Sequence, residues 1–142
     1  MVPEYHSSEG FDPSEPAIGA RLERVVVDPS LGRLVVVRAA GKGAAYALLT
    51  FGFSLEYGGR DAFVDEIYLR ADYRGRGWGR RLLEFVEHEA KRCGVRALHL
   101  EVARENAAAL ELYRQFGFED HDRYLMTKRI APESQPRGVR RM

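Results

Sequence analysis

The chain has 142 residues, of which 45% are hydrophobic and 30% are charged, and its formal net charge is +1. This composition is that of one globular domain, and the near-zero charge excludes a global field that attracts nucleic acid or an anionic membrane. A single cysteine, Cys93, excludes an internal disulfide and a cysteine-rich zinc site. We expect one domain over residues 1–142, with flexible tails at residues 1–16 and 131–142.

The N-terminus has neither the basic region nor the apolar run of a secretory signal. The apolar runs of the chain are all far shorter than the ~20 residues that a membrane span needs. A soluble protein of the cytoplasm is therefore expected.

Hydrophobic periodicity and turn residues predict the elements in chain order. They are a short helix up to about Val26, a hairpin of strands at 33–40 and 44–54, a strand at 62–70, a helix between Gly77 and Gly94, a strand at 95–102, a helix at 107–116 and a last strand at 122–130. The strand–helix–strand unit from Phe63 to Val102 requires a right-handed crossover and a parallel strand pair. The predicted fold class is α/β (α+β), with helices flanking a mixed, mostly antiparallel sheet.

Residues 71–90, ADYRGRGWGRRLLEFVEHEA, place a turn rich in glycine and arginine directly before an amphipathic helix. Glycine lets the backbone adopt φ > 0 and approach a ligand closely, and a helix N-terminus offers unpaired N–H groups and a partial positive charge. The turn therefore suits a phosphate, although its spacing is neither the dinucleotide fingerprint nor a P-loop. A plain glycine loop is an alternative. Nucleic-acid binding is less favoured, because aromatic stacking residues are missing from a neighbouring strand.

Two motifs resemble those of the GNAT superfamily of N-acetyltransferases. The stretch YRGRGWGRRLLEF is similar to the family's acetyl-CoA turn, Arg/Gln-x-x-Gly-x-Gly/Ala, with Arg74, Gly77 and Gly79 in its places. The stretch LHLEVARENAAALELYRQFGFE resembles the family's strand–Asn–helix–Tyr–Gly–Phe signature, which is filled by Asn106, Ala109, Tyr113, Gly117 and Phe118. The motifs stand in the expected order, about 30 residues apart, and the resemblance covers about residues 33–130.

The resemblance implies a sheet in which two central parallel strands, FVDEIYLR and VRALHLEV, splay apart and admit acetyl-CoA as a co-substrate. It assigns the pyrophosphate to backbone N–H groups of the turn, namely those of Arg74, Gly75, Arg76, Gly77, Trp78, Gly79 and Arg80. It pairs the pantetheine arm, like an added strand, with backbone groups of Ile67, Tyr68 and Leu69. Asn106 and Tyr113 would line the thioester end.

The N-terminal region departs from the family pattern. Members usually begin with a strand and two helices before the first hairpin, whereas about 30 residues precede the hairpin here. Those helices normally cover the acceptor side, so the resemblance leaves the acceptor open. An uncovered edge also suggests a homodimer.

Acetylation of an amine requires a base for the ammonium proton, a donor for the oxyanion and an acid for the leaving thiolate. The resemblance makes Tyr113 the candidate acid. Glu101 occupies the place of the base in ribosomal-protein N-terminal acetyltransferases, and Asp65 the place of an acidic base in polyamine acetyltransferases. Alternation along a strand places Asp65 and Glu66 on opposite faces unless a bulge intervenes. The base thus stays open among these three acids, which also favour a cationic acceptor.

The remaining candidates are interpreted as structural. The histidines show no ligand spacing, so no metal is predicted. His99 is interpreted as a packing residue of its strand, His88 as solvated, and Cys93 as a small apolar residue.

The predicted function is transfer of an acetyl group from acetyl-CoA to a primary amine of a small molecule or peptide, by direct attack in a ternary complex. The expected partners are acetyl-CoA and the amine, with no nucleic acid and no membrane. The alternative is a non-catalytic acyl-CoA-binding module that lacks an acceptor site.

Overall fold

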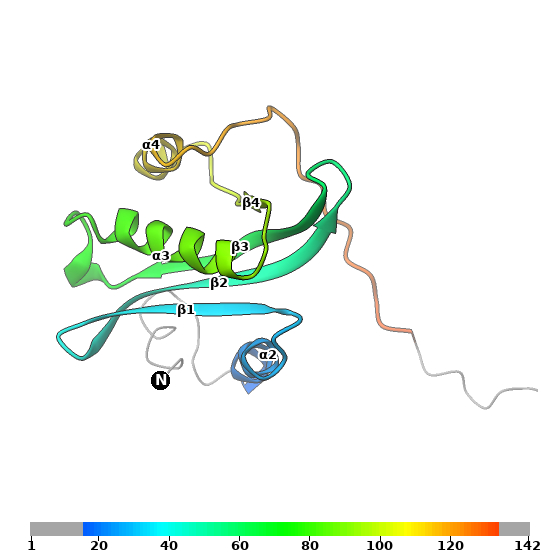
Figure 1. The fold of residues 1–142 in the computed structure, drawn as a ribbon, viewed down its shortest axis with the longest axis horizontal. Coiled ribbons are helices and arrows are strands. Elements are labelled where there is room, and N and C mark those ends of the chain that lie inside the picture. The colour runs from blue at the N-terminus through cyan, green and yellow to red at the C-terminus, as the bar shows by residue number, and fades with distance from the viewer. Residues whose placement is uncertain (1–15, 134–142) are drawn as a thin grey trace, which may run out of the picture.

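The computed structural model describes residues 16–133 (Figure 1). Their elements are α2 (Pro16–Val27), β1 (Gly32–Ala39), β2 (Lys42–Ser54), β3 (Gly59–Leu69), the 3-10 helix η1 (Ala71–Tyr73), α3 (Trp78–Arg92), β4 (Ala97–His99) and α4 (Ala107–Gln115). One four-stranded sheet has the order β1-β2-β3-β4, antiparallel except for the parallel pair β3–β4. The predicted fold class is confirmed. Most of the two predicted tails lies outside the described residues.

Helix α3 forms the core with one face of the sheet. Its buried residues Leu82 and Val86 pack against alternate residues of the strands, which are Val37, Ala45, Ala47, Leu49 and Val64. The intervening residues of β2 and β3 point to the opposite face, because side chains alternate along a strand. There Tyr46 and Tyr68 are buried with ring centroids 5.5 Å apart. Helix α2 packs against β1 (Figure 1).

The predicted helix ends are confirmed at both glycines. Gly94 follows α3 with φ of 74°, and Gly117 follows α4 with φ of 102°. Beyond α4, the N–H of Phe118 donates to the carbonyl of Tyr113 at 2.9 Å, which closes the last turn. The same backbone bond brings the ring of Phe118 edge-on to the ring of Tyr113, with centroids 5.9 Å apart.

The parallel strands separate after a short shared ladder. Their pairing begins at Asp61 with Ala97 and ends at Phe63 with His99, although β3 continues to Leu69. Beyond Phe63, the edge of β3 that faced β4 therefore has no strand partner among the described residues. This divergence is the splay that the family resemblance implied.

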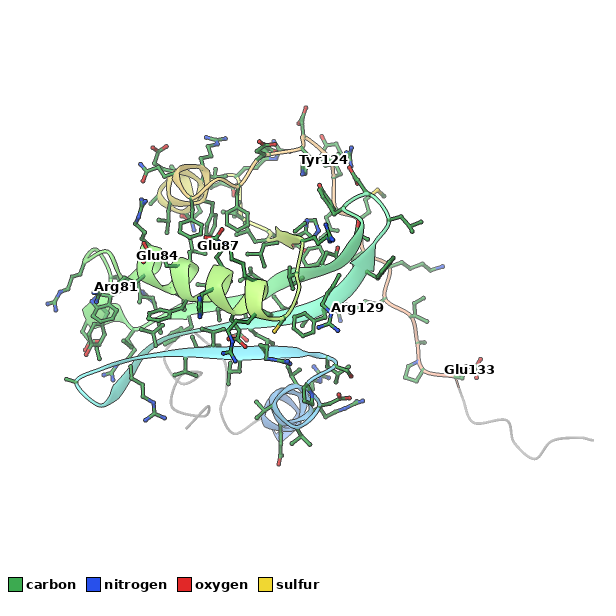
Figure 2. All side chains as sticks on the ribbon, viewed as in Figure 1. Arg81, Glu84, Glu87, Tyr124, Arg129 and Glu133 are labelled. Atoms are coloured by element: carbon green, nitrogen blue, oxygen red, sulfur yellow. The ribbon has the colours of Figure 1, made fainter. Side chains whose placement is uncertain are left out.

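The predicted last strand at residues 122–130 is wrong. No strand is assigned after α4 within the described residues, and the segment runs beside the sheet without joining it (Figures 1 and 2). A strand requires a partner ladder, and β4 offers a paired length of three residues. Four large apolar side chains of the segment are consequently exposed, those of Tyr124, Leu125, Met126 and Ile130.

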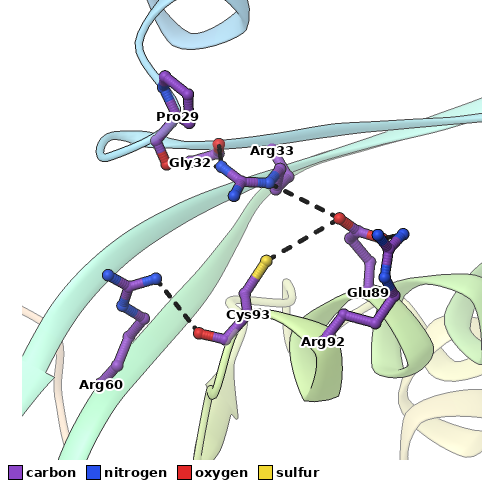
Figure 3. A network of polar contacts seen from close by, with 7 residues as sticks. All are labelled: Pro29, Gly32, Arg33, Arg60, Glu89, Arg92 and Cys93. Atoms are coloured by element: carbon purple, nitrogen blue, oxygen red, sulfur yellow. Dashed lines mark hydrogen bonds and ion pairs between the residues drawn. The ribbon is translucent and has the colours of Figure 1, made fainter.

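A polar network fixes the C-terminal end of α3 to the sheet (Figure 3). Glu89 of α3 accepts from Arg92 at 3.1 Å, and its other oxygen lies 3.6 Å from Nε of Arg33 on β1. Arg60 of β3 donates to the carbonyl oxygen of Cys93 at 3.2 Å. The guanidinium groups of Arg33 and Arg60 both lie over the ring of Phe51, 5.4 and 4.7 Å from its centroid. The predicted structural interpretation of Cys93 agrees with its half-buried place in this network.

Glu89→Ala is expected to lower the free energy of unfolding by about 1–2 kcal/mol, because the side chain is mostly buried and its loss leaves Arg33 without its carboxylate. The matched control is Glu87→Ala, whose exposed ion pair with Lys91 is worth roughly 0.5 kcal/mol or less. Chemical denaturation of the three proteins measures the difference. Equal destabilisation by both substitutions would contradict the role given to the network.

Candidate active site

The turn before α3 has the backbone of an anion site. Gly75 has φ of 73° and Gly77 has φ of 80°, both in the left-handed region that favours glycine. Gly77 is the N-cap of α3 and supplies no capping side chain, so the first N–H groups of the helix lack an intrahelical or capping partner. Nothing lies within 4 Å of the place that a Cβ would occupy on either glycine. Exposed N–H groups at the positive end of a helix are suited to a phosphate.

Other residues of the same turn are engaged in packing. The ring of Trp78 packs at the core and edge-on against Tyr73. A Cβ on Gly79 would lie 3.2 Å from Cδ2 of Leu112, so this glycine allows α3 and α4 to approach closely. Nε of Arg74 donates to the carbonyl of Leu69 at 3.0 Å and ties the turn to the end of β3. The structure thus gives Gly79 a packing reason that the sequence did not reveal.

Strand β3 leads into this turn with an open edge. The side chains of Ile67 and Leu69 pack against the α3 core, and Tyr68 is buried on the other face. Their backbones pair with β2 on one edge, whereas the opposite edge has separated from β4. An extended ligand can add to such an edge by main-chain hydrogen bonds.

A cleft of about 1160 Å³ lies beside β4. It is bounded by β4 and the residues that follow it, the flanks of α3 and α4, and the segment after α4. Among the predicted site residues, Glu101 and Tyr113 line it, together with His99. The turn of residues 74–80, Asp65 and Asn106 do not line this cleft. The structure therefore places one candidate base and the candidate acid in the lining of the same cleft.

Tyr113 has the environment of a proton donor. Its side chain is half-buried on α4, and burial raises its pKa above the ordinary value of 10.0. No described residue is hydrogen-bonded to its hydroxyl, and no buried polar side-chain atom lacks a partner in the described part of the chain, so the hydroxyl is open to the cleft. The raised pKa keeps the proton on the hydroxyl through the neutral range.

The three candidate bases differ in their surroundings. Glu101 is exposed at the cleft. Asp65 is the extra residue of a β-bulge, because Leu49 pairs with Val64 while Leu48 pairs with Glu66, and its side chain is exposed. Glu66 accepts a hydrogen bond from the hydroxyl of Tyr46 at 2.7 Å. The simple alternation expected for Asp65 and Glu66 is interrupted by this bulge.

Asn106 caps α4, since its side-chain oxygen accepts from the N–H of Ala109 at 3.2 Å. Among residues 16–133 there is no group of three or more His, Cys, Asp or Glu side chains placed to hold a metal ion. None of the described helices is long and apolar enough to cross a bilayer.

His99 is the residue whose surroundings the sequence did not predict. Its Nε2 lies 3.0 Å from Oδ2 of Asp61 on the neighbouring strand, and the pair is mostly buried. The signal for this contact is the register of the parallel ladder, which sequence periodicity cannot supply.

Comparison with known proteins identifies the family of this chain. The sequence model of the acetyltransferase (GNAT) family matches residues 2–118. The chain belongs to the GNAT family. The [ribosomal protein bS18]-alanine N-acetyltransferase of Escherichia coli K12 is 38% identical to this GNAT protein over 80 residues, covering 56% of the chain and 50% of the relative. The thialysine N-epsilon-acetyltransferase of Bos taurus is 33% identical over 75 residues, covering 53% and 44%. The GNAT chain spans about half the length of the curated relatives that it matches.

Solved structures share the fold. An integron cassette protein from the mobile metagenome of a salt marsh superposes with a TM-score of 0.75 at 34% identity, covering 93% of this GNAT chain and 82% of its own. The aminoglycoside N-acetyltransferase AAC(6')-Iy, crystallised with CoA, superposes with a TM-score of 0.67 at 18% identity, covering 81% and 87%. At 18% identity, the likeness to AAC(6')-Iy shows a shared fold alone.

Proposed function

We propose that this GNAT protein transfers the acetyl group of acetyl-CoA to a primary amine by direct attack in a ternary complex. The observation that carries the proposal is the meeting of Glu101 and Tyr113 in one cleft, a carboxylate for the cationic amine and a protonated hydroxyl for the leaving sulfur. Family membership and the open turn before α3 support it.

Acetyl-CoA would bind along the path from the turn to the cleft. The N–H groups at the start of α3 hold the pyrophosphate, and the open edge of β3 at Ile67–Leu69 pairs with the pantetheine arm. Asn106 is assigned to the thioester end by the family motif alone, because its side chain caps α4 and does not line the cleft. A GNAT protein of the same fold was crystallised with CoA, which supports this choice of co-substrate.

The amine reaches the thioester as an ammonium ion, because an alkyl amine with a pKa near 10.4 is mostly protonated at neutral pH. Glu101 attracts the ammonium and supports its deprotonation, and we favour it over Asp65 because it shares the cleft with Tyr113. The free amine forms the C–N bond, the C–S bond breaks, and Tyr113 gives its proton to the thiolate. The resulting tyrosinate takes the proton that the new amide nitrogen loses.

The acceptor is proposed to be cationic, because Asp65, Glu66 and Glu101 add negative charge near the splay. Relatives are named for thialysine and for an alanine of ribosomal protein bS18, and a protein of the same fold for aminoglycosides. A location in the cytoplasm and assembly as a homodimer stay predictions.

The test is release of CoA thiol from acetyl-CoA with four amines, namely thialysine, an alanine-terminated peptide, an aminoglycoside and a polyamine. We expect at least one amine to raise thiol release well above the rate without amine. Binding of acetyl-CoA, measured by thermal shift, with no acceleration by any amine would favour the non-catalytic acyl-CoA-binding module. No binding at all would contradict both functions.

A further inference from the structure

His99 occupies the point at which the two parallel strands separate. It pairs with Phe63 in the last rung of the β3–β4 ladder, and the aromatic rings of Phe63 and Tyr57 lie 5.2 and 5.4 Å from its own ring. Its neighbours Leu98 and Leu100 pack towards the α3 core, whereas His99 contacts Asp61 and lines the cleft. The imidazole is thus held at the apex of the splay, on the cleft that Glu101 and Tyr113 share.

Asp61 determines which nitrogen of His99 carries the proton. An ionised carboxylate only accepts hydrogen bonds, so Nε2, 3.0 Å from Oδ2, is the donor. In the neutral imidazole, Nδ1 then carries the lone pair. Nδ1 has no hydrogen-bond partner in the described residues, and since no buried polar side-chain atom there lacks a partner, it is open to solvent in the cleft.

Charged and titratable side chains surround His99 from several elements. Asp61 faces it from β3, Tyr57 from the β2–β3 turn, and His121, 3.4 Å from the hydroxyl of Tyr57, from the segment after α4. The cleft that it lines also contains Glu56, Glu87, Lys91, Arg96, Glu101, Arg104, Arg114, Glu119, Asp120 and Arg123. Among these groups the Asp61 carboxylate is the one in hydrogen-bond contact with the ring, and it stabilises the imidazolium that forms when Nδ1 takes a proton.

We propose that the proton of the acceptor ammonium ends on Nδ1 of His99, which Asp61 orients. The inference rests on the proposed acetyl transfer and names the proton acceptor that it needs. Glu101 follows His99 by two residues, so their Cα atoms are at most roughly 7 Å apart, a span that one water molecule can bridge between the side chains. The ammonium bound at Glu101 passes one proton through this water to Nδ1, and the imidazolium later releases it to solvent. The lone pair on Nδ1 can accept the proton, and the Asp61 carboxylate at 3.0 Å offsets the charge of the imidazolium that results.

The first test is the pH profile of kcat/KM with acetyl-CoA and the amine of the panel that is turned over fastest. His99→Gln is expected to lower kcat/KM about 100-fold at neutral pH and to remove the limb on which activity rises as the imidazole loses its proton. Asp61→Asn is expected to give a smaller loss, because the amide oxygen can still accept from Nε2 but carries no charge to stabilise the imidazolium.

The matched control is His88→Gln, an exposed histidine of α3 that does not line the cleft, and it should leave the profile unchanged. Thermal unfolding and acetyl-CoA affinity of each variant identify a loss of fold. In His99→Ala, added imidazole should restore part of the rate, which repair of packing alone would not do. A wild-type profile in both His99→Gln and Asp61→Asn overturns the inference and leaves acetyl transfer standing. If no amine of the panel raises CoA release by the wild-type protein, the proposed function is overturned, and the inference with it.

A second test needs no activity. The ¹⁵N shifts of labelled histidine, assigned by comparison with His99→Gln, should show a proton on Nε2 and a bare Nδ1 in the neutral ring. The opposite tautomer would contradict the inference, because Nδ1 could then not accept a proton.

Discussion

Tyr113→Phe is expected to lower kcat about 100-fold while leaving the affinity for acetyl-CoA within a factor of two or so, since general acid catalysis typically contributes at least that factor. The ring and its edge-on contact with Phe118 are retained in the variant, and the hydroxyl has no hydrogen-bond partner among the described residues. The substitution therefore removes a proton donor and little packing. Steady-state rates and a separate acetyl-CoA titration measure the two quantities.

The comparison for Tyr113→Phe is Tyr124→Phe, which removes the hydroxyl of another tyrosine that lines the cleft. Its side chain is 87% exposed, and its loss should lower kcat far less. The pH dependence gives a further check. Since burial raises the pKa of Tyr113, its proton stays in place at neutral pH, and activity through this group should fall only at pH above 10.0. An unaltered kcat at saturating substrates would remove Tyr113 from the mechanism.

Gly77→Val is expected to weaken acetyl-CoA binding roughly 10- to 100-fold, which corresponds to about 1.4–2.7 kcal/mol. Two effects add. A β-branched residue at φ of 80° is strained by roughly 1–2 kcal/mol, so the turn shifts away from its arrangement. The new side chain also projects into the open space before α3, where the pyrophosphate would approach the N–H groups. Calorimetric titration with acetyl-CoA measures the change.

The hairpin turn between β1 and β2 supplies a control for the strain alone. Gly41 has φ of 77° and open space around the place of a Cβ, so Gly41→Val imposes a similar backbone penalty away from α3. Both variants should lose stability, but Gly41→Val should bind acetyl-CoA as the wild type does. If the two variants bind equally well, the turn before α3 is not the pyrophosphate site.

The sequence predicted the elements of the core well, because their signals are local. The apolar spacing of Leu82 and Val86 and the glycine that follows α3 define that helix without knowledge of its partners. The segment at 122–130 contains the apolar run at 124–126 and is predicted as a strand as well, yet it forms none. Pairing depends on a free edge of sufficient length, and the local pattern carries no information on the three-residue length of β4.

Local sequence patterns were equally insufficient for part of the candidate site. The two motifs gave the turn and Tyr113, because their residue types and spacings are fixed by the chemistry of the family. The Asp61–His99 contact and the bulge at Asp65 depend instead on the register of neighbouring strands. A shift of one residue in register turns a side chain to the other face, so neither feature could be derived from one sequence.

The most direct test of acetyl transfer follows an isotope-labelled acetyl group. The protein is incubated with labelled acetyl-CoA and each of the four amines, and the amine and the protein are then analysed by mass spectrometry. We predict that the label appears as an amide on at least one amine, in amounts equal to the CoA released, with none bound to the protein. Label recovered only as free acetate, or retained on acetyl-CoA with every amine, would contradict the proposed transfer.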